Sequence, residues 1–415
     1  LRLLGLFLND FGAGLAGMTP RLPGVRGPLN WAVRSDGTSG YLFVSHYQRL
    51  SPQPDRQNVQ FRIKLAAGEL TLPSLPATIP YDTRFFWPLN LDLGGATLVA
   101  ATAQPIARIR DGDTHYAIFK QTAAIPSEFT FDGSTVTVDA CAGQISTEGS
   151  RLQVRDVRPG LDAAIRLRGK DGRRQVIVLL DEATAPQVWK AEWQGRERLF
   201  LSSNDLLPDG ETLRLRSENL QDRSVAIFPA PAGVTDSGDG LSASVDGLFR
   251  RFSPRTAPPE PLRAVVEQVR AAGPARAIPI APSVPSRKQG MAMQPEEADF
   301  SQAAVWRVKL PAGVDPTRRL RLRVQYTGDV IRAYLGDRLL ADDFYNARPF
   351  EIGLRRYGPS IYRDGLELKI LPLREDAPIY LTDRSKLAFD DRGTALGLAR
   401  VEVIETHEMR LRAEK

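Results

Sequence analysis

The chain has 415 residues, of which 42% are hydrophobic and 25% are charged, an ordinary globular composition that excludes wholesale disorder. This length predicts roughly two to four domains, each large enough to bury a core. The single cysteine, Cys141, excludes an intrachain disulfide. Because many periplasmic proteins also lack disulfides, the compartment stays open, with a periplasmic or secreted location slightly favoured over the cytoplasm.

The formal net charge of +6 permits binding to nucleic acid or to a membrane surface, but the distribution of charge argues against both. In the run from Arg319 to Val324, arginines alternate with leucine and valine. On a strand this alternation places the arginines in water and the apolar side chains in the core. No run of about 18 apolar residues is present to form a transmembrane helix. We therefore expect neither nucleic acid nor a membrane as a partner.

The first residues carry a helical pattern. Leu4, Leu8, Phe11 and Leu15 recur at helical spacing and predict one apolar face, and the prolines at positions 20 and 23 end the helix. A signal peptide is the alternative for this leucine-rich start, but polar residues at positions 9 and 10 interrupt it and no basic segment precedes it. We expect residues 1–22 to form a helix that completes an upstream domain.

Patterns with a period of two dominate from residue 23 onward and predict antiparallel β structure. A first β domain, 23–125, is expected to contain strands near 41–47, 59–65, 69–72, 85–93, 96–102, 106–109 and 115–119. A β-sandwich domain, 126–235, is expected to contain strands near 134–138, 151–154, 164–167, 175–180, 213–216 and 225–228. Asp171-Gly172 is typical of a hairpin turn between two of these strands.

Composition then shifts, because proline and alanine are frequent from position 255 to position 297. We interpret 236–300 as a linker or long loop, with a short possible helix at 261–272. A third β domain, 301–415, is expected to contain strands near 304–310, 320–326, 330–335, 366–371 and 398–404. The predicted fold class is therefore mainly β, with successive antiparallel sandwich or jelly-roll domains after one short N-terminal helix.

The histidines offer no complete catalytic or metal-binding constellation. Only three are present, His46, His115 and His407, and they lie far apart in the sequence. No Gly-x-Ser-x-Gly nucleophile elbow, zinc-ligand spacing or phosphate-binding loop accompanies them. His46 and His115 fall within strand patterns, and we interpret both as half-buried structural residues. We expect no metal and no cofactor.

Carboxylates are plentiful, so a glycosidase-like pair of acids has to be considered. The doublets Asp342-Asp343 and Asp390-Asp391 are poor candidates, because adjacent residues on a strand point to opposite faces. We interpret them as surface turns or cation contacts and expect no catalytic residue in this chain.

The tryptophans are candidates for sugar contacts, because carbohydrate sites commonly set an aromatic face against a pyranose ring. They are Trp31, Trp87, Trp189, Trp193 and Trp306. Core packing is the alternative, and for any one of these tryptophans it is favoured. Trp189 and Trp193 are four residues apart, so a helix there would place both on one face and dock that face onto a sheet.

Five residues are selected as candidate carbohydrate contacts: Trp87, Trp306, Asp343, Tyr345 and Asn346. The last three belong to a segment, 342–353, that combines aromatic, amide and charged side chains. Such a composition suits either a ligand-binding loop or a loop at a domain interface, and the sequence leaves both open.

In chain order, several segments resemble the region that follows the catalytic barrel of bacterial glycoside hydrolase family 35 β-galactosidases. They are Leu6–Gly12, Gly40–Arg49, Val59–Ile63, Ile79–Leu93, Trp189–Leu199, Tyr326–Arg338 and Asp343–Asn346. The first is similar to the helix that ends that barrel, and the last two are similar to a galactose-binding-like jelly roll. The resemblance covers nearly the whole chain, and the order of the motifs is more specific than any one of them.

This resemblance implies the C-terminal, non-catalytic region of an enzyme that releases terminal β-galactose from oligosaccharides or polysaccharide side chains. It implies an upstream (β/α)8 barrel as partner, with two catalytic glutamates, one of which follows an asparagine. This chain contains no Asn-Glu dipeptide. No catalytic residue of the family therefore carries over to any position here.

Three functions remain open on the sequence. The chain forms the accessory half of a β-galactosidase, buttressing the barrel and shaping one wall of the substrate cleft. Alternatively, it is a stand-alone carbohydrate-binding protein, which requires saturable galactoside binding by this chain alone. The third possibility is a structural module whose basic surface holds an acidic polymer, which requires binding that collapses with added salt.

Overall fold

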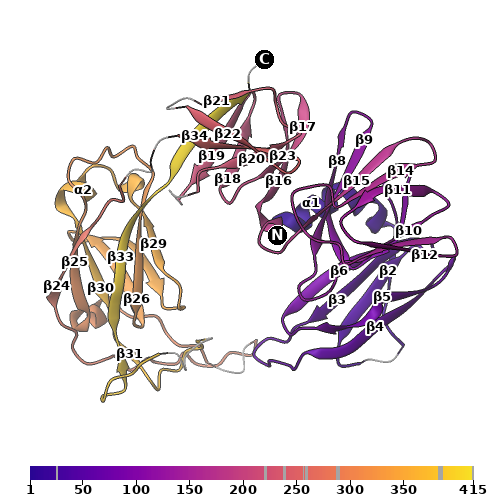
Figure 1. Cartoon of the computed structure of the whole chain (residues 1–415). Coiled ribbons are helices and arrows are strands. Elements are labelled where there is room, and N and C mark those ends of the chain that lie inside the picture. Colours follow the sequence, from indigo (N-terminus) through magenta and orange to yellow (C-terminus); the bar gives the residue numbers. More distant parts are fainter. Residues whose placement is uncertain are drawn as a thin grey trace. The chain divides into compact units, whose positions relative to one another are not determined.

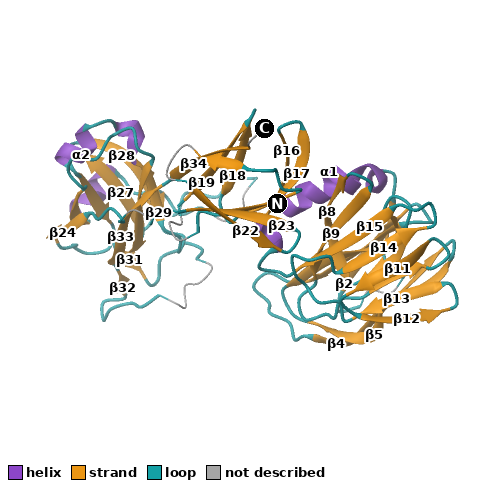
Figure 2. Cartoon of the chain, turned by 45° about the horizontal axis from the view of Figure 1, so that its top comes forward, coloured by secondary structure: helices purple, strands orange, loops and turns teal. Residues whose placement is uncertain are grey.

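In this computed structural model, the described residues are 1–24, 27–218, 222–236, 240–255, 257, 260–286, 290–381 and 387–413. The chain forms two compact units, and Figure 1 labels their elements. The first unit contains Leu1–Ala257 and Glu408–Lys415, and the second contains Pro258–His407. Strands dominate both units (Figure 2), which confirms the predicted mainly β fold with a short N-terminal helix.

Helix α1 (Arg2–Ala16) begins the first unit, and two of the four residues predicted for its apolar face, Phe11 and Leu15, are buried. Phe7 and Phe11 are buried against aromatic side chains of the neighbouring sheet. Leu4 and Leu8, expected on the buried face, are instead 46% and 45% exposed. The phenylalanine stripe is the one covered, since aromatic side chains bury more apolar area than leucines. The helix therefore carries a second, uncovered apolar stripe.

The largest sheet of the first unit has eight strands, and each is antiparallel to its neighbours. In spatial order they are β1 (Thr19–Arg21), β2 (Asn30–Ser35), β3 (Gly40–His46), β6 (Thr83–Asp92), β7 (Thr97–Ala101), β10 (Phe129–Asp132), β13 (Arg151–Arg155) and β12 (Gln144–Glu148). One face is covered by the hairpin of β4 (Arg56–Leu65) and β5 (Gly68–Ile79). The opposite face meets α1, where Phe7 packs against Phe86 of β6.

A five-stranded sheet packs against the first one. Its order is β11 (Val136–Cys141), β14 (Ile165–Gly169), β15 (Arg174–Leu180), β9 (Thr114–Gln121) and β8 (Ala103–Asp111). Phe119 and Ile177 share a core with Phe129 of the large sheet, while Val176 and Val178 pack on the other side against a third sheet. Because both faces are covered, 175–180 reads as a nearly continuous apolar run with no alternation.

The expected turn before this strand is confirmed. Strands β14 and β15 pair as an antiparallel hairpin. Gly172 has φ of +81°, a conformation that glycine adopts without strain, and Asp171 accepts the backbone N–H of Arg173 at 3.0 Å.

The rest of the first unit is a second sandwich. One sheet is β16 (Val188–Trp193), β17 (Arg196–Leu201), β20 (Val225–Phe228), β23 (Phe249–Pro254) and β22 (Leu241–Asp246), preceded by a 3₁₀ turn, η1 (Ala185–Gln187). The facing sheet is β18 (Asp205–Asp209), β19 (Thr212–Ser217), β34 (His407–Ala413) and β21 (Val234–Asp236). Trp193 and Leu411 lie in the core between them. The stretch containing Trp189 and Trp193 is thus a strand and not a helix, although residues four apart share a face in either.

The second unit is a sandwich of its own. One sheet is β24 (Val265–Arg270), β25 (Ala304–Lys309), β30 (Leu366–Ile370), β27 (Val330–Leu335) and β28 (Arg338–Phe344), and the other is β29 (Phe350–Gly353), β26 (Leu320–Thr327) and β33 (Gly397–Glu405). Short elements complete it: η2 (Glu297–Gln302), η3 (Leu354–Tyr357), α2 (Ser360–Asp364), β31 (Leu373–Arg374) and β32 (Thr394–Ala395). In β26, arginines at 321 and 323 alternate with the buried Leu320, Leu322 and Val324, as the sequence predicts.

The strand pairing does not follow the expected domain limits. The limit at 125/126 cuts through both sheets of the first sandwich, since β7 pairs with β10 and β9 pairs with β15. The interval 236–300, expected as a linker, contributes β22 and β23 to a sheet, while its residues 237–239, 256, 258–259 and 287–289 lie outside the described residues. The block 301–415 loses its last residues to the first unit through β34.

The possible helix at 261–272 is wrong, because that segment holds β24. All six residues of β24 are exposed, and the strand lies at the edge of its sheet. An edge strand with no buried face shows no apolar alternation, so the pattern that identifies most strands is missing here.

Candidate functional site

Trp87, a predicted sugar contact, lies in the core of the first unit. Its side chain is fully buried on β6, and its ring stacks on Phe85 with centroids 4.4 Å apart. Its Nε1 donates a hydrogen bond to Oγ1 of Thr122 at 3.0 Å. A buried indole presents no face to a pyranose ring, so we do not retain Trp87 as a direct contact.

Trp306 lies in the other unit and is also part of a core. It is on β25, is 9% exposed, and packs with side chains of both sheets of the second sandwich. Each candidate tryptophan therefore lies in the core of its own unit, and core packing accounts for its position.

The three candidates from the 342–353 segment behave differently. Oδ2 of Asp343 accepts a hydrogen bond from the Tyr326 hydroxyl at 3.0 Å, and Tyr345 meets the Tyr326 ring edge-on at 5.5 Å. Burial raises the pKa of Asp343, although the hydrogen bond from Tyr326 opposes that rise. Asn346 is exposed, and its Oδ1 accepts the backbone N–H of Arg348 at 3.0 Å. Asp343 and Tyr345 thus contact one tyrosine, while Asn346 shapes a turn.

The carboxylate doublets have the predicted geometry. Asp342 is exposed on β28 while its neighbour Asp343 is half-buried, so the two point to opposite faces. Asp390 accepts backbone N–H groups of Arg392 and Thr394 at 3.0 and 2.8 Å, which is a turn. Neither doublet holds two carboxyl groups across a common space.

The two strand histidines differ from one another. His46 is 3% exposed, and its Nε2 lies 3.0 Å from the carbonyl oxygen of Pro54, a structural contact. His115 is half-buried, and burial, followed by nearby arginines, lowers its pKa. Among the described residues, no group of three His, Cys, Asp or Glu side chains is arranged to hold a metal ion. Within the same part of the chain, no helix has the length and apolarity needed to cross a bilayer.

Asp10 and Lys190 form a buried ion pair at the edge strand β8. Nζ of Lys190 lies 2.7 Å from Oδ1 of Asp10, and the two side chains are 7% and 5% exposed. Asp10 also accepts the backbone N–H of Arg108, while Lys190 donates to the Arg108 carbonyl oxygen. The pair therefore satisfies backbone groups on the open side of β8 and ties α1 to β16.

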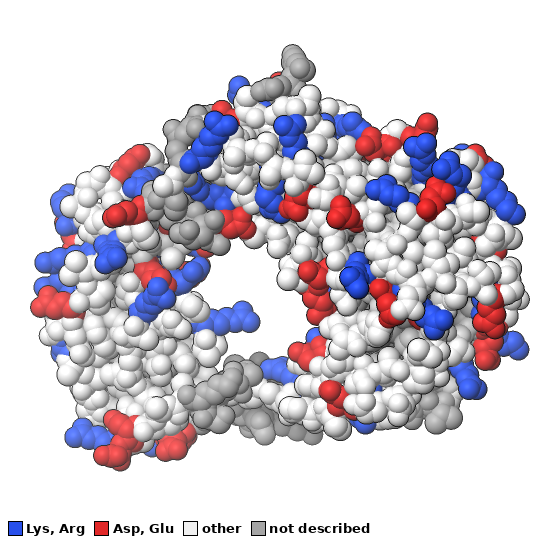
Figure 3. Space-filling model, viewed as in Figure 1, with Lys and Arg blue, Asp and Glu red and all other residues white. Residues whose placement is uncertain are grey.

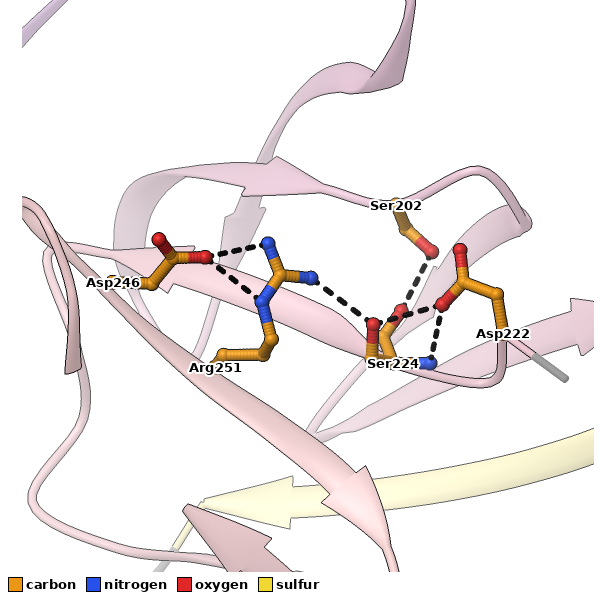
Figure 4. Close-up of polar contacts among 5 residues, drawn as sticks. All are labelled: Ser202, Asp222, Ser224, Asp246 and Arg251. Atoms are coloured by element: carbon orange, nitrogen blue, oxygen red, sulfur yellow. Dashed lines mark hydrogen bonds and ion pairs between the residues drawn. The ribbon is translucent and has the colours of Figure 1, made fainter. Parts of the chain in front are cut away.

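A network of serine, aspartate and arginine side chains occupies the second sandwich of this unit (Figure 4). We call it the serine network; its members are Ser202, Asp222, Ser224, Asp246 and Arg251. The Ser224 hydroxyl donates to Asp222 at 2.9 Å and accepts from Arg251 at 3.0 Å, and Arg251 also donates twice to Asp246. Every member has a partner within the network. Among the described residues, no hydrogen bond joins either serine to a histidine, which a nucleophilic serine would need as its base.

An apolar groove of about 1040 Å³ lies beside the start of α1. Its apolar lining is Leu1, Leu3, Leu4, Leu22, Pro23, Leu29, Trp31, Phe43, Val44, Phe85 and Phe86. Among the described residues that line it, Arg84 is the one with a charged side chain. Leu22 is 72% exposed, so leucine faces water here. A contiguous apolar surface of this kind is typical of a protein–protein contact.

A smaller polar pocket of about 260 Å³ adjoins the groove. It is lined by Asp82, Thr83, Arg84, Phe85, Gln104, Lys120, Gln121, Thr122, Ala123 and Glu182. Arg84, Phe85 and Gln104 line both cavities, which are therefore adjacent. Trp87 does not line the pocket, but its Nε1 donates a hydrogen bond to the lining residue Thr122.

The sequence did not single out any side chain of the polar pocket as a site residue. Gln104 and Lys120 are opposite partners on β8 and β9, where a polar residue within a strand pattern indicates only a solvated face. Asp82 and Arg84 lie in a segment whose strand pattern likewise carries no sign of a binding site. Strands β6, β8 and β9 belong to two sheets, so their pairing brings the lining together.

Comparison with known proteins does not place the chain in a family. No protein-family model matches the sequence, and no curated protein matches it. Fold and cavities define the class: a protein of successive β-sandwiches with an apolar groove and an adjoining polar pocket in its first unit. On the face seen in Figure 3, basic and acidic side chains are interspersed in both units.

Proposed function

We propose that this chain forms the accessory β domains of a β-galactosidase-like glycoside hydrolase. The catalytic glutamates of the parent enzyme would lie in a separate (β/α)8 barrel, and this chain would buttress that barrel. The observation that carries the proposal is the apolar groove beside α1. The ordered resemblance of segments from Leu6–Gly12 to Asp343–Asn346 supports the same assignment.

The groove suits the barrel as its occupant because α1 is apolar on two sides. Phe7 and Phe11 pack on the large sheet, while Leu4 lines the open groove. A helix with apolar stripes on two sides is typical of an element between two packed layers. Most of the described lining is apolar, and an apolar protein surface that covers it would release ordered water.

The division of labour follows from the chemistry of glycoside hydrolysis. Cleavage needs one carboxyl group as proton donor and a second as nucleophile or base, held across the scissile bond. In the proposed enzyme both come from the barrel. The β domains would hold the barrel in place and form one wall of the cleft, so their loss would affect stability and substrate binding more than the chemical step.

The first test is to read the DNA upstream of the codon for Leu1 and to express the complete reading frame. An open frame that encodes a βα-repeating barrel with two glutamates at strand ends, and a product that hydrolyses 4-nitrophenyl β-D-galactoside, is the expected result. A frame that lacks such a barrel, or a product without galactosidase activity, would overturn the proposal.

The groove is tested in that complete protein with Leu4→Asp combined with Leu22→Asp. Burying carboxylates in an apolar contact is costly, so we expect the domains to unfold in separate calorimetric transitions and activity to fall. Leu75→Asp is the matched control, since Leu75 is 64% exposed on β5 and does not line the groove. Identical behaviour of the groove variant and the control would contradict the assignment of the groove.

A stand-alone carbohydrate-binding protein is the second candidate, and the polar pocket is the observation that favours it. It requires saturable sugar binding by this chain and no galactosidase barrel in the reading frame. The upstream sequence therefore separates the two candidates.

A further inference from the structure

The polar pocket combines charges that cancel. Its lining includes two cationic and two anionic side chains, and each cation has a carboxylate beside it. Nη1 of Arg84 lies 3.0 Å from Oδ1 of Asp82, and Nζ of Lys120 lies 3.0 Å from Oε1 of Glu182. An anionic ligand would have to compete with these carboxylates. The pocket is thus matched to a neutral ligand that has hydrogen-bonding groups.

Two amides in the pocket have unused hydrogen-bonding capacity. Gln104 and Gln121 are half-buried, and neither side chain makes a hydrogen bond within the described ranges of the chain. Each amide offers two N–H donors and one acceptor oxygen. A half-buried amide without a protein partner is satisfied either by water or by a ligand.

Donors and acceptors therefore stand side by side around the pocket. Lys120 and Arg84 donate, Asp82 and Glu182 accept, and the amides do both. Vicinal hydroxyl groups of a sugar have the same double character, since each one donates and accepts.

Size limits the ligand. The pocket holds about 260 Å³, just below the range of about 300 Å³ at which sites for drug-sized molecules begin. A single pyranose ring fits such a volume. Thr122, which lines the pocket, accepts a hydrogen bond from the buried Trp87.

We propose that the polar pocket binds one neutral pyranose unit through Gln104, Gln121 and the paired side chains around them. The choice of galactose as that unit rests on the proposed function. Because Arg84, Phe85 and Gln104 line both cavities, the bound sugar lies at the rim of the groove. At this rim, an oligosaccharide bound in the pocket would be next to a catalytic domain docked in the groove.

The test is calorimetric titration of this chain with galactose, with glucose as a second neutral hexose and inorganic phosphate as the anionic probe. We expect saturable galactose binding in the millimolar range and no phosphate binding. The double variant Gln104→Ala/Gln121→Ala should weaken galactose binding by at least about tenfold, since two ligand hydrogen bonds are lost. Gln153→Ala is the matched control, a half-buried glutamine of β13 outside the pocket, and should bind as the unchanged chain does.

Folding of each variant is checked by its thermal midpoint, and Lys120→Met provides an independent variant of the same pocket. Absence of hexose binding, binding of phosphate in place of hexoses, or equal binding by the pocket variants and Gln153→Ala would overturn the proposal. Glucose binding with no galactose binding would keep the sugar site and remove galactose as its ligand. No catalytic domain is present in the titration, so its outcome is independent of the test of the groove.

Discussion

Two polar regions of the first unit differ in how far their hydrogen bonds are satisfied within the protein. In the serine network, each side chain bonds to another member, and Arg251 and Asp222 flank one serine hydroxyl (Figure 4). In the polar pocket, Gln104 and Gln121 have no partner among the described residues. A satisfied network stabilises the fold, whereas an open one leaves room for a ligand. The following variants test that difference, beginning with the largest expected effect.

The largest effect among these variants is expected from breaking the buried pair of Asp10 and Lys190. Replacing Lys190 with Met leaves a buried carboxylate without its cation, and we expect the free energy of unfolding to fall by about 3–5 kcal/mol. Urea denaturation followed by tryptophan fluorescence measures the change. Arg168→Met is the control, because its pair with Asp139 is 49% and 37% exposed and should contribute less than about 1 kcal/mol. Equal losses in both variants would show that burial does not set the effect.

Within the serine network, Asp222→Ala removes the acceptor of several hydrogen bonds. The hydroxyls of Ser203 and Ser224 donate to its carboxylate at 2.6 and 2.9 Å. Leaving these donors unpaired should cost about 1–3 kcal/mol of unfolding free energy. The same urea experiment measures it, and the loss should exceed that of any single polar-pocket variant. A smaller loss of unfolding free energy than in the pocket variants would contradict the prediction that the satisfied network stabilises the fold more.

The network should also make stability depend on pH. Burial raises the pKa of Asp222, but hydrogen bonds from Ser203 and Ser224 outweigh that effect, and the net pKa is lowered. A lowered folded pKa stabilises the protein above the unfolded value, about 3.9, and this stabilisation is lost as pH falls through the folded pKa. The difference in urea midpoint between the unchanged chain and Asp222→Asn should therefore be constant above about pH 5 and shrink below about pH 4. A difference that does not change with pH would exclude this linkage.

The smallest effect on stability is expected in the polar pocket. Gln104→Ala and Gln121→Ala remove amides with no partner in the described chain, so each should change the unfolding free energy by no more than about 0.5 kcal/mol. Urea midpoints of both variants, measured without and with galactose, separate stability from binding. A large loss of unfolding free energy in the absence of galactose would show that the two amides stabilise the fold. The pocket would then be a structural feature, as the serine network is.

Much of the fold could be predicted from the sequence because strand signals are local. Alternation in β26 and the Asp171-Gly172 turn needed no knowledge of the rest of the chain. Strand β24 was missed because it buries no face, and the limit at 125/126 was misplaced because sheets join strands that are distant in sequence. Local patterns do not contain that long-range pairing.

The candidate site was much less predictable. Trp87 was selected for its ring, but packing placed that ring in the core, where its Nε1 supports Thr122 from behind the polar pocket. Nothing in the sequence marked Gln104 and Gln121 as binding residues, because a polar residue in a strand normally faces water. What makes them notable is a shared cavity, and that depends on three strands from two sheets.

The sequence by itself determined the mainly β class, the short helix at the start and the positions of most strands, because backbone sterics and apolar periodicity act within a few residues. Tertiary structure alone decided which apolar stripe of α1 was buried and which polar side chains were left with open hydrogen-bonding capacity. Both outcomes depend on what each face packs against. In this protein the packing covers the phenylalanines of α1 and leaves Leu4 in an open groove, next to the polar pocket.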